Sequence, residues 1–304
     1  MTAHDILQHL KRYLLWAGLA LCIYALWRSQ ALSMKRHEQL DLPHWIYAGF
    51  LLTLILLFAI ASWRTYLRAY LLNEADWHTA TRQLGLLLIG KYIPGGIFGF
   101  LLRIYDQPRT QRLKLLWASI ADQSIGLGTT TLVAGVLMAT ASQRNWLWMI
   151  LILPIPLLAN AGIVLLHHCA KWVPWLSRHT NTAPDAHNGQ LCLAASFQLC
   201  QAVTWAVLVA MLTTQLYDLP PYAAIGTAGA YLLAVGAGML MVFLPGGIGA
   251  REAALTALAS PWIDLPQALY LGALMRILTS LVDVAAGAGS ATLGLWKRPE
   301  SANH

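Results

Sequence analysis

One short element occurs twice: residues 93–97 read Ile-Pro-Gly-Gly-Ile and residues 244–248 read Leu-Pro-Gly-Gly-Ile. Each copy follows an apolar run and is itself followed by an arginine, Arg103 or Arg251. Proline has no backbone N–H, and glycine adopts dihedral angles closed to other residues, so each copy should interrupt a helix. The repeat therefore predicts two broken segments at corresponding positions of two halves.

The composition places these breaks in a membrane. Of 304 residues, 58% are apolar and only 11% are charged, against roughly 25% charged in soluble chains. So few charges exclude a soluble globule, and a bilayer needs about 20 apolar residues for each helical crossing. All spans should be helices, because lipid offers backbone groups no partner. Hydropathy predicts spans at about 13–27, 45–63, 115–140, 146–167, 190–216, 222–243 and 268–296.

We expect an all-α polytopic bundle, a single membrane domain over residues 1–304 with seven or eight spans. The basic residues in 64–83 and 103–114 predict that both loops are cytoplasmic. The broken stretch between them, 84–102, should then dip in and return as a re-entrant segment. The second, 244–259, re-enters or crosses, which leaves the number of spans open. The halves of this pseudo-repeat are about 1–167 and 190–304, with a linker at about 168–189.

The paired breaks indicate a binding site. Free backbone groups at membrane depth persist only when they are buried in protein or line a wet cavity. Broken segments at corresponding positions of two halves are typical of a transporter's substrate site. The alternative is that the glycines only permit close helix contact, as Gly95 and Gly99 would at their GxxxG spacing. The duplication and the adjacent charges favour the site.

Charged residues beside the breaks suit an anionic ligand. Arg251 opens a predicted short helix through Ala259, where free amides, the helix dipole and a planar guanidinium together suit a phosphate. Glu252 is expected to be a helix-start acid or a partner of Arg251, not a catalytic base. Lys91 either extends to the lipid headgroups or contacts a lipid phosphate.

Three ionisable residues fall inside predicted spans, where a charge costs about 2.5 to 3.5 kcal/mol. Arg276 and Asp283 lie seven residues apart, two turns along one helical face, so both can face one cavity. Asp122 follows the first break and Arg276 follows the second. An Asp122–Arg276 ion pair across the halves is the structural alternative to substrate contact. The candidate substrate-binding residues are Lys91, Tyr92, Pro94, Gly95, Gly96, Arg103, Asp122, Pro245, Gly246, Gly247, Arg251, Glu252, Arg276 and Asp283.

Neither catalytic nor metal chemistry is indicated. HExxH and GxSxG motifs are absent, and the cluster His167-His168-Cys169 has no fourth ligand at useful spacing. We therefore expect no cofactor and no enzyme. The 20 Lys and Arg against 13 Asp and Glu indicate loops held at an anionic membrane face, not nucleic-acid binding.

At residues 90–96, at residues 244–254 and at Arg276, the chain resembles the transmembrane region of the lysylphosphatidylglycerol synthase family. This is the flippase-like membrane domain of the multiple peptide resistance proteins and of free-standing relatives. The resemblance implies an inner-membrane protein that handles phospholipids, moving aminoacylated lipids between leaflets in the bifunctional members. The resemblance also implies a link, for some free-standing relatives, to envelope glycolipid or polyprenyl-lipid pathways. Where the family often has Glu-Arg, this chain has Asp122-Gln123, and no soluble aminoacyltransferase domain follows residue 296, so lysyl transfer is not expected.

Three function classes follow. The first is a lipid transporter of the bacterial inner membrane, handling anionic or aminoacylated phospholipids or polyprenyl-linked lipids. The second is a non-catalytic accessory subunit that places a partner enzyme of envelope lipid or glycolipid synthesis at the membrane. The third is a membrane-embedded transferase. A transporter moves lipid unaltered, an enzyme changes the mass of the lipid, and an accessory subunit does neither.

Overall fold

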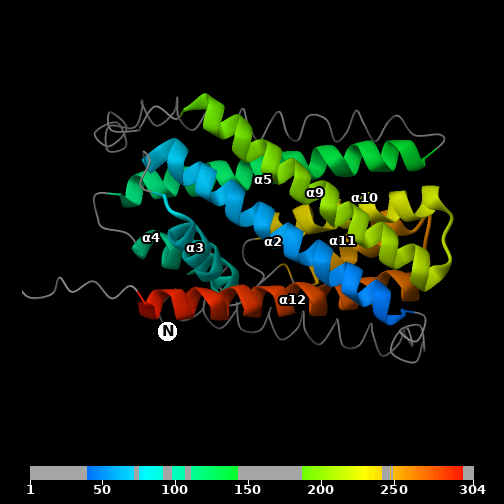
Figure 1. Ribbon diagram of the computed structural model, residues 1–304. Helices are drawn as coiled ribbons and strands as arrows, with labels where there is room; N and C mark the ends of the chain where they lie inside the picture. Colours follow the sequence, from blue (N-terminus) through cyan, green and yellow to red (C-terminus); the bar gives the residue numbers. More distant parts are fainter. Residues whose placement is uncertain are drawn as a thin grey trace, which may run out of the picture.

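The computed structural model describes residues 40–71, 75–91, 98–106, 111–142, 187–241, 247 and 249–296, and in these ranges the chain is all-α (Figure 1). This confirms the predicted all-α class. The helices are α2 (Leu42–Leu71), α3 (Trp77–Gly90), α4 (Phe98–Tyr105), α5 (Arg112–Ala141), α9 (Asn188–Tyr217), α10 (Pro221–Leu240), α11 (Ala250–Ala259) and α12 (Leu265–Trp296).

Five of these helices are long and apolar enough to cross a membrane. Each overlaps one of the predicted spans, and the fold is that of a multi-pass helical membrane protein. The predicted spans 13–27 and 146–167 lie outside the described residues, as does most of the predicted linker. The five candidate spans are Leu42–Tyr70, Arg112–Ala141, Asn188–Tyr217, Pro221–Leu240 and Leu265–Ser290.

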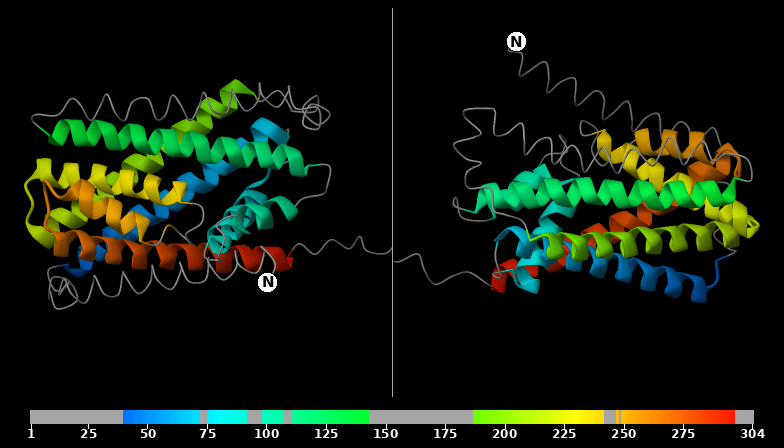
Figure 2. Two further views of the ribbon diagram at one scale, coloured as in Figure 1. Left: turned by 180° about the vertical axis from the view of Figure 1, so that it is seen from behind. Right: turned by 90° about the horizontal axis from the view of Figure 1, so that it is seen from above.

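The long helices form a bundle with short helices inside it. α5 and α12 run along opposite sides, while α2 and α9 pack on each other and cross the bundle obliquely (Figures 1 and 2). The short helices α3, α4 and α11 lie between α5 and α12, where α3 packs on α12 and α11 packs on α10. This arrangement places the ends of the broken segments in the interior of the bundle.

Small residues allow α3 to lie directly against α12. A Cβ atom added at Gly85 of α3 would collide with the side chain of Ser290, and one added at Gly287 of α12 would collide with Ile89. Backbones approach this closely in membranes where glycine removes the side chain. Glycine also packs α4 on α3, since a Cβ at Gly99 would lie 2.6 Å from the Leu87 carbonyl oxygen. The close-contact alternative therefore holds for Gly99.

Both breaks separate helices where the sequence predicts. α3 ends at Gly90 and α4 begins at Phe98, while α10 ends at Leu240 and α11 begins at Ala250. Within the second break Gly247 has a φ of 66°, in the region that favours glycine. A Cβ at Gly247 would also lie 2.8 Å from Gly238. The chain can therefore turn against α10 only with glycine at this position.

Candidate functional site

A cavity of about 430 Å³ lies inside the bundle, and all eight described helices contribute to its wall. Much of the wall is apolar, with a smaller set of polar side chains, which is the usual composition of a ligand site. Gly247 reaches the wall from the second break. The charged residues in the wall are Lys91, Asp122, Arg251, Arg276 and Asp283.

Lys91 and Asp283 meet at this wall. Lys91 follows α3, and its Nζ lies 2.6 Å from Oδ2 of Asp283 in α12. Asp283 is buried, whereas the lysine side chain is 37% exposed. Arg276 and Asp283 do share one cavity, as predicted. Lys91, for which we expected either extension to the lipid headgroups or contact with a lipid phosphate, has a carboxylate partner inside the protein.

Glu252 fixes both the start of α11 and the orientation of Arg276. The backbone N–H of Gly249 donates to Oε2 of Glu252 at 2.8 Å, which caps the helix. The other carboxylate oxygen accepts a hydrogen bond from Nε of Arg276 at 3.0 Å. The helix-start role of Glu252 is thus confirmed. The ion pair found for it joins Arg276, not the expected Arg251.

Arg251 stands at the N-terminal end of α11 with its guanidinium against Tyr231 of α10. The guanidinium carbon lies 4.7 Å from the centroid of the ring, within cation–π range. Its Nη2 also donates a hydrogen bond to the Tyr231 hydroxyl. Tyr231 is itself in the cavity wall. The aromatic ring therefore orients the arginine at the wall.

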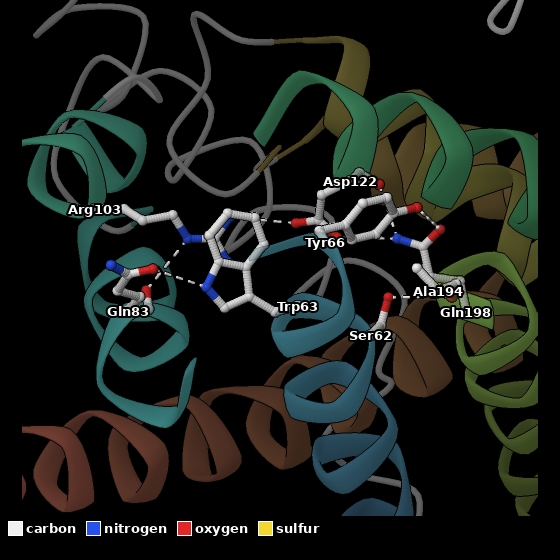
Figure 3. A network of polar contacts seen from close by, with 8 residues as sticks. All are labelled: Ser62, Trp63, Tyr66, Gln83, Arg103, Asp122, Ala194 and Gln198. Carbon is white, nitrogen blue, oxygen red and sulfur yellow. Dashed lines mark hydrogen bonds and ion pairs between the residues drawn. The ribbon is translucent and has the colours of Figure 1, made fainter. Parts of the chain in front are cut away.

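Arg103 and Asp122 form a buried pair beside the cavity (Figure 3). Nη1 of Arg103 lies 3.3 Å from Oδ2 of Asp122. Nε of Arg103 donates to the backbone carbonyl oxygen of Gln83 at 3.4 Å. The guanidinium carbon lies 3.3 Å from the centroid of the Trp63 ring. Arg103 is fully buried and is not in the cavity wall. The position indicates a structural role for this candidate residue.

The expected Asp122–Arg276 ion pair is therefore wrong. Asp122 pairs with Arg103, while Arg276 pairs with Glu252. The physical reason is proximity, because each break is followed by a short helix that brings its own oppositely charged partner. α4 supplies Arg103 beside α5, and α11 supplies Glu252 beside α12.

A network that the sequence analysis missed continues from Asp122. The amide of Gln198 donates to the Asp122 carboxylate at 3.0 Å and to its backbone carbonyl at 2.9 Å. The Tyr66 hydroxyl donates to the Gln198 carbonyl oxygen at 3.1 Å, and Trp63 Nε1 donates to Gln83 at 3.1 Å. Figure 3 shows these side chains converging from α2, α3, α4, α5 and α9. Glutamines inside apolar spans were the signal that could have revealed it.

Six of the predicted site residues line the cavity. Five of them carry charged side chains, and the sixth is Gly247. Glu252 stands behind Arg276, and Arg103 stands behind Asp122. The remaining predicted residues lie outside the described part of the chain: Tyr92, Pro94, Gly95, Gly96, Pro245 and Gly246.

Among the described residues, no group of three or more His, Cys, Asp and Glu side chains could hold a metal ion.

The chain matches no protein-family model, no curated protein and no solved structure. The resemblance to the lysylphosphatidylglycerol synthase membrane region stays a prediction. The site must therefore be interpreted from its own geometry.

Proposed function

We propose that this chain is a flippase-like lipid transporter that admits the headgroup of an anionic lipid to the cavity. One observation carries the proposal. Three cations line a single cavity in an apolar bundle: Lys91, Arg251 and Arg276. Each comes from a segment that flanks a break or from the helix that follows that segment. A charge inside a membrane costs about 2.5 to 3.5 kcal/mol on insertion scales, and such residues mark substrate pathways.

The balance of charge supports an anionic ligand. Among the described residues, the cavity wall and the side chains paired with it carry four cations and three acids, a difference of one positive charge. Arginine donates two parallel hydrogen bonds to phosphate, and such charge-assisted bonds are the strong ones. A phosphate between Arg251 and Arg276 would add its negative charge to a site that is positive without it.

The dimensions suit a headgroup alone. A volume of about 430 Å³ falls at the lower end of the roughly 300 to 1,000 Å³ of ligand pockets. A whole lipid is larger, so the acyl chains remain in the bilayer while the headgroup enters. Rocking of one half against the other then changes the leaflet to which the cavity opens.

The short helices support the re-entrant arrangement. At 1.5 Å per residue, α3, α4 and α11 are about 21, 12 and 15 Å long, against about 30 Å of hydrocarbon. The helix lengths also follow one order in each half. Helices α2 to α5 have 30, 14, 8 and 30 residues, and helices α9 to α12 have 30, 20, 10 and 32 residues. We keep the pseudo-repeat, with seven or eight spans in the bacterial inner membrane.

Reconstitution tests the proposal. Purified protein in vesicles is given fluorescent phosphatidylglycerol, aminoacyl-phosphatidylglycerol or polyprenyl phosphate, and leaflet movement and lipid mass are both measured. Movement of unaltered lipid that is lost in folded Arg251→Ala and Arg276→Ala, but retained in the control Lys114→Ala outside the cavity, supports a transporter. Movement unaffected by both cavity variants contradicts the phosphate site.

The same assay addresses the other two classes. A change in lipid mass assigns a transferase. If a folded protein neither moves nor alters any of the lipids, the transporter proposal fails and an accessory subunit of an envelope lipid enzyme takes its place.

A further inference from the structure

We infer that the distal part of the transported headgroup is a neutral polyol, such as glycerol, inositol or a sugar, joined through a phosphodiester. The inference rests on the proposed function and names the class of substrate within it. It excludes headgroups that end in an amine. The carrying observation is that the two sides of the cavity differ in chemistry.

The cations gather on one side of the cavity. Lys91 follows α3, Arg251 opens α11 and Arg276 lies in α12, and these helices pack together through α3–α12 and α11–α12 contacts. Figures 1 and 2 show α12 along one side of the bundle and α5 along the other. A phosphate held by the arginines therefore lies on the α12 side, and the rest of the headgroup extends toward α5.

Apart from Asp122, whose carboxylate is paired with Arg103, the polar groups that line the side formed by α5 and α9 are neutral. Gln123, Thr129 and Thr130 come from α5, and Gln201 comes from α9. Within the described part of the chain, the Thr130 hydroxyl and the Gln201 amide have no hydrogen-bond partner. Hydroxyl and amide groups both donate and accept. The hydroxyls of a polyol also donate and accept hydrogen bonds, so they can pair with these neutral groups without carrying a charge.

An ammonium group finds no available carboxylate on that wall. Asp122 already binds Arg103 through Oδ2 and Gln198 through Oδ1. Across the cavity Asp283 lies 2.6 Å from Lys91. A buried charge without a partner is costly, so ethanolamine, choline or aminoacyl groups would have to displace an existing cation. The wall accordingly discriminates against amines.

The net charge also distinguishes two kinds of phosphate. The described residues of the site leave one positive charge, which one phosphodiester balances. A phosphomonoester carries about −1.5 to −2 at neutral pH and would leave uncompensated negative charge in the bundle. The site therefore fits a diester with a hydroxyl-rich end.

A headgroup series tests the inference on the full chain in vesicles. Phosphatidylglycerol and phosphatidylinositol should move at least about tenfold faster than phosphatidylethanolamine or lysyl-phosphatidylglycerol. The double variant Thr130→Val/Gln201→Leu should reduce this preference about tenfold, while Gln215→Leu, on an exposed face of α9, should leave it unchanged. Equal or faster movement of the amine lipids, or an unchanged preference in the double variant, overturns the inference.

Binding of soluble headgroups separates this inference from the proposed function. Glycerophosphoglycerol should bind the purified protein at least about tenfold more tightly than glycerophosphoethanolamine, and the double variant should remove the difference. If no lipid moves in vesicles, the proposed function fails. A binding preference for glycerophosphoglycerol would still support a polyol diester site, but its ligand would be a soluble diester. Equal binding of the two diesters overturns the polyol inference, whatever the transport result.

Discussion

Lys91, which follows α3, and Asp283 of α12 form an ion pair of 2.6 Å between residues far apart in the sequence. Unlike the pairs Arg82–Asp106, Arg103–Asp122 and Arg276–Glu252, it connects a residue before α5 to a residue after α9. Gly85 and Gly287 bring the two helices together on the same interface. The start of the first break is therefore attached to α12, the last helix of the described chain.

Replacement of Asp283 by Asn should destabilise this joint. The substitution keeps the size of the side chain but removes the partner of Lys91, and we expect a loss of about 1 to 3 kcal/mol in the free energy of unfolding. Lys91→Met should cost a similar amount. Denaturant unfolding in mild detergent measures each variant and the double variant. The double variant should lose at least about 0.5 kcal/mol less than the sum of the singles, and additive losses would argue against the ion pair.

The α3–α12 interface should tolerate no side chain at Gly85. Gly85→Ala places a methyl group against Ser290 and the Ala286 carbonyl, and overpacking of this kind costs about 1 to 3 kcal/mol. Gly289 of the same α12 has nothing within 4 Å of an added Cβ, so Gly289→Ala should be neutral or stabilise the helix by up to about 1 kcal/mol. The melting temperatures of the two variants in detergent, each compared with that of the unmodified chain, measure these effects. Equal temperatures for the two variants would contradict the close packing.

The buried network around Arg103 should matter for stability more than for ligand binding. Asp122→Asn leaves the fully buried guanidinium of Arg103 without its carboxylate, and breaking such a pair costs about 3 to 5 kcal/mol. Arg251→Gln, at the cavity wall, should cost about 1 kcal/mol or less. Because Arg103 stacks on Trp63, near-ultraviolet circular dichroism follows the network directly. A stable Asp122→Asn variant with an unchanged spectrum would contradict the structural role.

The sequence predicted the helices and the breaks because both depend on local rules. Five described spans match hydropathy windows, since lipid imposes one solution on a long apolar segment. The element at 244–248 precedes a helix that begins at Ala250, since proline and glycine interrupt a helix regardless of the surrounding protein. The shared cavity of Arg276 and Asp283 followed from helical periodicity alone.

The partners of the charged residues could not be predicted in the same way. Asp122 and Arg276 occupy corresponding positions, which suggested a pair, but pairing depends on the packing of neighbouring helices. α4 brings Arg103 to Asp122, and the first turn of α11 brings Glu252 to Arg276. Gln198 was overlooked because a neutral residue in an apolar span gives a weak signal, although it donates two hydrogen bonds to Asp122.

The most direct test of a headgroup site in the cavity is the binding of short-chain phosphatidylglycerol to the purified protein in detergent. We predict that Arg251→Gln and Arg276→Gln each weaken binding about tenfold or more, as expected for loss of a charge-assisted hydrogen bond. Lys114→Gln, outside the cavity, should bind like the unmodified chain, and phosphate-free diacylglycerol should bind at least about tenfold more weakly than phosphatidylglycerol. If both cavity variants bind the lipid as tightly as the unmodified chain, the cavity does not hold the phosphate and the account is wrong.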